Sequence, residues 1–259
     1  MNLYKIGLLC LSICVIIGML ILMYFDKLNI KIFETFESNR FNVYRLGDII
    51  RHMDNHVISD KYLDLHKNTI GYEYAKNTNK KNDYKTLKKI CDKRKNDLND
   101  LPKQNELIIH VRLGDVIEKS IYTVDEYLEK ERVSKGETIS SNVVYIKSRK
   151  FFENYILNEI NKIKDIDTVI FVGGDHRNLD SLNKSNEYLQ KVSKIFRDNG
   201  YKTHIKFNEH TADEDFVYLS NAKYYVPTGG GFSKSVMEMV KLNNNIVYDK
   251  YLDLGKIGY

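Results

Sequence analysis

The stretch Leu107-Ile-Ile-His-Val-Arg-Leu-Gly-Asp115 decides how the rest of the chain is interpreted. It begins with the apolar run Leu107-Ile108-Ile109, which is typical of a strand that is buried on both faces. The stretch ends in three polar side chains, His110, Arg112 and Asp115. Gly114 lets the backbone turn sharply between them. A buried strand that ends in such groups predicts polar residues gathered at one edge of a sheet.

The chain beyond this strand alternates short apolar runs with amphipathic stretches. This alternation predicts an α/β fold with a mostly parallel, Rossmann-like sheet covered by helices on both faces. The further predicted strands are Thr168–Val172, Thr203–Phe207, Lys223–Val226 and Ile246–Tyr248. The predicted helices are Val144–Lys164, Leu189–Arg197, Phe216–Ser220 and Ser233–Leu242.

Three of the predicted strands are followed by glycines and polar residues, at 110–115, 173–176 and 228–233. In a parallel sheet these loops share one edge, where such folds bind their ligands. The Arg112 guanidinium suits phosphate oxygens, and Asp175 suits a ribose or a base edge. The alternatives are an ordinary strand end with a surface Arg-Asp pair, and a tight turn in which Asp175 caps a helix.

The run Gly229-Gly230-Gly231 precedes a predicted helix and is the better anion site. Its free N–H groups, those of Phe232 and Ser233, and the positive end of the helix dipole all favour a phosphate. The hydroxyls of Ser233 and Ser235 add possible donors. Together with Arg112, this run predicts a binding site for a nucleoside diphosphate.

Two other phosphate or metal motifs are excluded or disfavoured. Lys234-Ser235 ends like a Walker A loop, but Thr228 and Ser233 stand where that motif needs glycine. The pair Asp213 and Asp215 resembles a metal-binding Asp-x-Asp. However, Thr211-Ala-Asp-Glu214 is a capping box, which gives those acids a place at a helix start. The His residues lack zinc-ligand spacing, so we expect neither a metal nor another resident cofactor.

Composition limits the possible partners. The 259 residues include 40 Lys or Arg against 35 Asp or Glu, and the lysines are spread along the chain, so we do not expect nucleic-acid binding. Of three cysteines, Cys10 and Cys14 lie in an apolar N-terminal run and Cys91 stands alone, so the remainder of the chain contains no disulfide and no thiolate metal site.

Residues 6–25 form an uncharged apolar run, long enough to cross the ~30 Å core of a bilayer. We predict an uncleaved transmembrane anchor in residues 1–27, because bulky Met23-Tyr24-Phe25 occupies the position of a cleavage site. Residues 28–105 then form a short N-terminal region and linker, with the charged stretch Lys76–Asp100 as a solvated helix and loop. Residues 106–259 form the Rossmann-like domain.

Taken together, these segments resemble the α1,2-/α1,6-/protein O-fucosyltransferase superfamily, and α1,2-fucosyltransferases most closely in motif layout. His110-Val-Arg-Leu-Gly-Asp115 is similar to the family motif His-x-Arg-x-x-Asp, and Phe171-Val-Gly-Gly-Asp175 to the strand whose terminal acid faces the nucleotide. Asp215 through Ser233 resembles a third family segment. The resemblance covers residues 107–242 and implies a GT-B type fold, here with a reduced N-terminal half.

The resemblance also implies inverting transfer of fucose from GDP-fucose to a glycan or protein hydroxyl. It assigns catalytic roles to Arg112, His110 and Asp115, and donor binding to Asp175, Asp215, Phe232 and Ser233. The anion site predicted at the glycine run adds Gly229, Gly230, Gly231 and Ser235 to the donor-binding residues. The chain departs from the family at Gly229-Gly230-Gly231, where Asn-Ser-Ser is usual, and at Leu113, where a second Arg is common.

The alternatives are transfer from another nucleotide sugar, and an anchored binding protein that has lost catalysis. Asp115 and Glu118 are both candidates for the general base, and a base from the N-terminal half is a further alternative. We expect a single-pass protein of the secretory pathway, Golgi-type, or of a host endomembrane.

Overall fold

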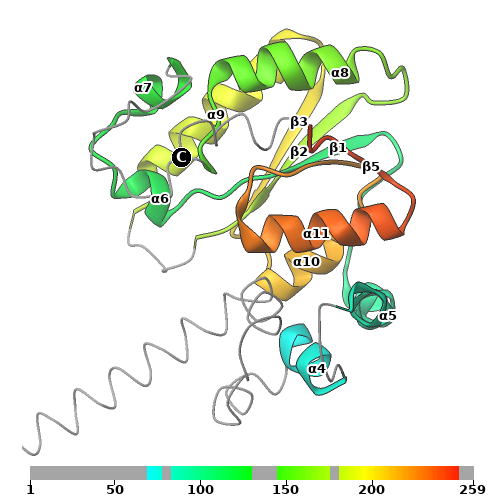
Figure 1. Ribbon diagram of the computed structural model, residues 1–259. Coiled ribbons are helices and arrows are strands. Elements are labelled where there is room, and N and C mark those ends of the chain that lie inside the picture. Colours follow the sequence, from blue (N-terminus) through cyan, green and yellow to red (C-terminus); the bar gives the residue numbers. More distant parts are fainter. Residues whose placement is uncertain (1–68, 78–82, 130–144, 176–180, 251–259) are drawn as a thin grey trace, which may run out of the picture. The chain divides into compact units, whose positions relative to one another are not determined.

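The computed structural model describes residues 69–77, 83–129, 145–175 and 181–250. At its centre is a five-stranded, all-parallel sheet in the order β3-β2-β1-β4-β5 (Figure 1). The strands are β1 (Glu106–His110), β2 (Thr168–Gly173), β3 (Lys202–Phe207), β4 (Tyr224–Val226) and β5 (Ile246–Val247). The predictions of an α/β fold and a parallel Rossmann-like sheet are confirmed.

Helices cover both faces of the sheet, as Figure 1 shows. On one face lie α6 (Asp115–Glu118), α7 (Val124–Glu129), the π-helix η3 (Phe151–Leu157), α8 (Asn158–Ile160) and α9 (Asn183–Asp198). On the other lie α10 (Ala212–Ser220) and α11 (Gly230–Leu242), packed on α5 (Tyr84–Arg94), with α4 (Ile70–Asn77) beside it. The short 3₁₀ turn η1 (Lys95–Asp97) follows α5.

Strand β1 is central and buried on both faces. Leu107 and Ile109 pack into the cluster under α9, while Ile108 packs into the cluster under α10 and α11. All five residues of β1 and all six of β2 are buried. This burial explains why apolar runs, and not an alternating pattern, marked these strands in the sequence.

The charged stretch before β1 is more than a solvated connection. Helix α5 buries Leu87, Ile90 and Cys91 in the cluster shared with β1, α10 and α11. Three lysines of this helix, Lys85, Lys89 and Lys93, are exposed and lie away from the buried face. The predicted helix is therefore confirmed, and one of its faces belongs to the core of the sheet domain.

Several helix boundaries differ from the sequence prediction, among them the start of α10, which lies at Ala212 and not at Phe216. The helical segment predicted from Val144 begins only after Ser148, so Tyr145 precedes it. Helix α9 starts at Asn183, six residues before Leu189, because the Glu118 carboxylate accepts hydrogen bonds from the backbone N–H groups of Lys184 and Ser185. Helix α11 starts at Gly230, so two of its glycines lie inside the first turn.

The described residues contain no helix that is both long and apolar enough to cross a membrane. The predicted anchor at residues 6–25, and most of the region 28–105, lie outside the described residues.

Candidate functional site at the carboxyl ends of β1 and β4

The strand order reverses between β1 and β4. The chain runs outward from β1 through β2 to β3, and then returns through α10 to β4 on the other side of β1. In open α/β sheets of this kind, ligands bind beyond the carboxyl ends of the strands at this reversal. The residues found there are 110–115, which follow β1, and 228–233, which follow β4.

The Arg112 side chain lies against the first turn of α11. A Cβ built on Gly230 would be 3.1 Å from Nη1 of Arg112, so the two residues are in direct contact. Gly230 has φ +87°, and the N-cap Gly229 has φ +117°. Glycine suits both positions, because other residues are strained there and because any side chain on Gly230 would fill the space that the guanidinium uses.

Arg112 is half-buried but has no acidic partner. Within residues 69–250, gaps excluded, no hydrogen bond or ion pair of its guanidinium is found, and its Nε is buried without a partner. Its guanidinium faces the ring of Tyr145, whose centroid lies 4.3 Å from Cζ. A cation held in this way keeps its N–H donors available to an anion.

The start of α11 offers further donors. The N-cap Gly229 has no side chain with which to cap this helix, and the first backbone N–H groups of an α-helix have no partner within it. Thr228, directly before the N-cap, is 2% exposed, and its Oγ1 is buried without a hydrogen-bond partner. The helix is 13 residues long, so its dipole adds positive potential at this end.

His110 ends β1 and is buried beneath this turn. Its ring centroid lies 5.3 Å from that of Phe232, and its Nδ1 is buried without a hydrogen-bond partner. Burial, assisted by the positive charge of Arg112, lowers the pKa of His110 to about 3. The imidazole is therefore neutral at physiological pH and does not compete with Arg112 for an anion.

The two predicted hydroxyl donors are used within the protein. Oγ of Ser233 lies 3.0 Å from the Tyr225 hydroxyl, and Ser235 donates a hydrogen bond of 3.0 Å to the Gly231 carbonyl. Both serines are buried. Their backbones lie in the first turns of α11. Their hydroxyls, however, bond within the protein and do not serve as the phosphate donors that the sequence suggested.

Asp115 and Glu118 have different surroundings. Asp115 is half-buried at the start of α6, directly after Gly114 with φ +59°. Glu118 binds the backbone of Lys184 and Ser185, so its carboxylate serves as the cap of α9. Of the two candidates for the general base, Glu118 already has this structural role.

Asp175 lies at the neighbouring strand end, two residues after β2. It is 3% exposed, and its backbone N–H donates to the side chain of Asn208 at 2.6 Å. A Cβ on Gly114 would collide with its carboxylate, so Gly114 is needed for this close approach. The loops after β1 and β2 therefore touch, as the sequence predicted, although Asp175 is buried beneath that contact.

Asp215 belongs to a second polar group, at the start of α10. Its Oδ1 lies 3.4 Å from Nδ1 of His210, and burial, with Glu214 and Glu209 nearby, raises its pKa to about 8. The neighbouring Phe216 packs edge-on against Phe232, with centroids 5.5 Å apart. The residue after Asp215 therefore packs against the first turn of α11.

The capping box at the start of α10 is present as predicted, with Thr211 and Glu214 bonding each other's backbone. Asp213 accepts a hydrogen bond of 2.8 Å from the backbone N–H of Ile70, the first residue of α4. These acids therefore organise helix starts. In the described part of the chain, no group of three or more His, Cys, Asp or Glu is arranged to hold a metal.

Sequence reasoning missed two residues of this site, Tyr145 and Thr228. Tyr145 was placed inside a predicted helix, and nothing in its local sequence points to Arg112 or to Gly229. Thr228 belongs to the polar stretch 228–233 predicted at a strand end, but the sequence analysis gives its hydroxyl no role. Its position directly after a buried strand and before a glycine run was the available signal.

No protein-family model matches this chain, and a search of curated proteins finds no match. The likeness to fucosyltransferases therefore remains a resemblance of motifs.

Proposed function

We propose that this chain is a glycosyltransferase that binds a nucleoside-diphosphate sugar at the carboxyl ends of β1 and β4. One observation carries the proposal: the Arg112 guanidinium, without an ion-pair partner in the described part of the chain, lies against Gly230 in the first turn of α11. A diphosphate presents oxygens that both a planar guanidinium and free helix N–H groups bind well.

The buried polar atoms nearby support the same ligand. Leaving a buried donor or acceptor without a partner costs about 1–3 kcal/mol. Three such atoms, Nε of Arg112, Nδ1 of His110 and Oγ1 of Thr228, lie around the start of α11. A bound phosphate offers acceptors to the guanidinium and the hydroxyl. It also brings the negative charge that the helix end favours.

In the proposed reaction, the bond between the sugar and the diphosphate breaks while an acceptor hydroxyl attacks from the opposite face. Negative charge collects on the departing diphosphate, where Arg112 and the α11 amides stabilise it. The acceptor proton passes to a general base. We assign this role to Asp115, which lies half-buried at the start of α6, three residues after Arg112.

Fucose from GDP-fucose is the donor that the motif resemblance favours, with a glycan or protein hydroxyl as acceptor. The identity of the donor sugar is part of this proposal. Attachment to a membrane through residues 6–25 is also part of it. The alternative, an anchored binding protein without catalysis, shares the same anion site and differs only in turnover.

The proposal is tested by thermal shift and calorimetry on the full chain with GDP-fucose, GDP, UDP-glucose and ADP-glucose. We expect GDP-fucose to stabilise the wild type and Arg112→Ala to abolish this stabilisation. We also expect Arg112→Ala to lower transfer by about 10²–10³-fold. A nucleotide sugar other than GDP-fucose that stabilises the protein more strongly would reassign the donor.

Arg112→Lys is the matched control, since it keeps the charge and loses the planar fork. Wild-type binding by Arg112→Ala would overturn the proposal. Tight donor binding with neither transfer nor donor hydrolysis would favour the binding protein.

A further inference from the structure

We propose that Tyr145 is a positioning residue whose ring holds the Arg112 guanidinium against the first turn of α11, ready to receive a diphosphate. This inference rests on the proposed function and adds a residue that no motif of the sequence indicated.

Tyr145 contacts both parts of the anion site. Its ring centroid lies 4.3 Å from Cζ of Arg112, within the range of a cation–π interaction. A Cβ built on Gly229 would lie 3.0 Å from Cδ1 of the ring, and one on Gly230 would lie 3.7 Å from Cε1. The ring, the guanidinium and the two glycines therefore form one continuous contact.

Arg112 needs such a support because its side chain is long and flexible. Fixing a free arginine upon ligand binding costs conformational entropy, which weakens the complex. A carboxylate partner would fix the side chain too, but it would occupy the donors and cancel the charge. An aromatic face fixes the plane of the guanidinium and leaves the N–H groups at its edge free for phosphate oxygens.

The half-buried position of Tyr145 strengthens this contact. The residue packs against the hydrophobic cluster on the α9 side of the sheet, so its ring is held from behind. Cation–π interactions gain strength when they are shielded from water. The ring therefore acts through Arg112, and the backbone amides of α11 supply their own share of the binding.

The test compares Tyr145→Phe with Tyr145→Leu in the full chain, with inorganic pyrophosphate and GDP as calorimetric probes. Tyr145→Phe keeps the aromatic face, and we expect affinities within about twofold of the wild type. Tyr145→Leu keeps an apolar side chain without the face, and we expect about tenfold weaker binding of both probes.

Tyr201→Leu is the matched control. Tyr201 directly precedes β3 and is also partly buried against the same cluster. Its hydroxyl donates a hydrogen bond to the side chain of Asn161, which directly follows α8. We expect this variant to bind both probes as the wild type does. Equal losses in Tyr145→Phe and Tyr145→Leu would overturn the proposal, as would an unchanged affinity in Tyr145→Leu.

The absence of tryptophan from the sequence allows a spectroscopic test. Tyr145→Trp places the only indole of the chain beneath the guanidinium, where we expect pyrophosphate to change its fluorescence. Adding Arg112→Ala to this variant should remove the response. A silent indole, in a variant for which calorimetry still records binding, would overturn the inference.

The two proposals fail in different ways. If the wild type binds neither pyrophosphate nor GDP, or if Arg112→Ala binds both normally, the proposed function and this inference fall together. If binding depends on Arg112 but not on the aromatic ring, only the role of Tyr145 falls.

Discussion

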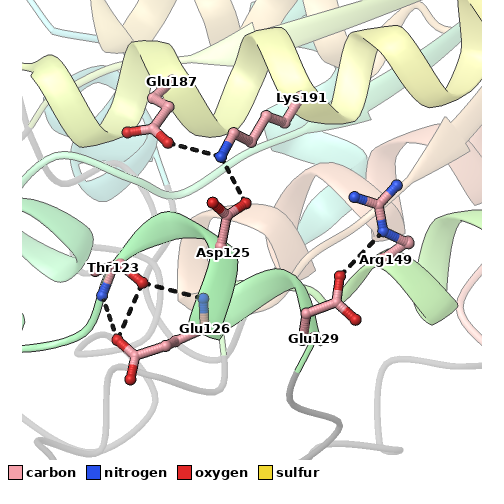
Figure 2. Close-up of polar contacts among 7 residues, drawn as sticks. All are labelled: Thr123, Asp125, Glu126, Glu129, Arg149, Glu187 and Lys191. Atoms are coloured by element: carbon pink, nitrogen blue, oxygen red, sulfur yellow. Dashed lines mark hydrogen bonds and ion pairs between the residues drawn. The ribbon is translucent and has the colours of Figure 1, made fainter.

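Two regions of the molecule are rich in polar side chains but differ in whether those side chains are paired with one another. Where α7 packs beside α9, the charges are paired (Figure 2). Lys191 lies 2.5 Å from Asp125 and 2.8 Å from Glu187. Thr123 and Glu126 bond each other at the start of α7. At the carboxyl ends of β1 and β4, by contrast, several buried polar atoms have no hydrogen-bond partner among the described residues.

The difference separates structural polar groups from those available for binding. Exposed ion pairs such as those on α7 and α9 contribute little, because water and salt screen them. Buried unpartnered groups destabilise the fold, so a protein that keeps several of them together gains something else from them. The strand ends fit this description, and the α7 surface does not.

The largest expected effect is on binding, in Gly230→Ala. The new methyl would lie 3.1 Å from Nη1 of Arg112, in a residue with φ +87°. We expect pyrophosphate affinity, measured by calorimetry, to fall by about a hundredfold, together with a lower Tm. Gly200→Ala is the control, because Gly200 has φ +90° but no atom within 4 Å of the added Cβ. If both variants lose only stability, Arg112 and Gly230 do not form one site.

The next effect concerns the stability of Asp215→Asn as pH changes. The pKa of Asp215 is raised from 3.8 to about 8, so the folded protein holds a proton that the unfolded chain releases. The wild type therefore loses stability as pH rises between these two values, and the variant lacks this loss. We expect the free energy of unfolding of the variant to rise relative to that of the wild type by roughly 1 kcal/mol per pH unit. Urea unfolding at a series of pH values measures this difference.

Asp125→Asn is the control for this pH dependence, because Asp125 lies on the exposed surface of α7. Its stability should follow that of the wild type through the same pH range. A wild type and an Asp215→Asn variant with parallel pH profiles would show that Asp215 is ionised in the folded protein.

A smaller effect, of opposite sign on stability and binding, is expected for Thr228→Val. Replacing the unpartnered hydroxyl by a methyl should leave Tm unchanged or raise it, while pyrophosphate binds several-fold more weakly. Ser193→Ala is the control, since Ser193 in α9 is another buried hydroxyl without a hydrogen-bond partner. Its Tm should also hold or rise, with binding intact. Equal binding in the two variants would exclude Thr228 from the site.

The smallest effect is expected on the paired surface, in Lys191→Ala. The side chains of Asp125 and Glu187 that contact Lys191 are largely exposed. We expect Tm to change by no more than about 2 °C, and the change to vanish in high salt. A large, salt-independent loss of Tm would show that these ion pairs stabilise the fold and do not differ from buried pairs in this respect.

Strands β1 and β2 were predictable because burial on both faces favours runs of apolar residues, as in Leu107–Ile109 and Val169–Val172. The capping box at Thr211 was predictable because its two partners are three residues apart. The start of α9 was not, because its cap comes from Glu118, more than sixty residues earlier in the chain. Tyr145 was missed for the same reason, since its partners come from distant segments.

The sequence by itself determined the α/β class, the parallel strands, and the presence of Arg112 and a glycine run at strand ends. These features depend on local pattern and on the shared direction of parallel strands. The contact of Arg112 with Gly230 and Tyr145, and the engagement of the Ser233 and Ser235 hydroxyls within the protein, become visible only in the folded structure. Such choices arise when distant segments pack, because packing alone determines which polar atoms find a partner and which are left without one.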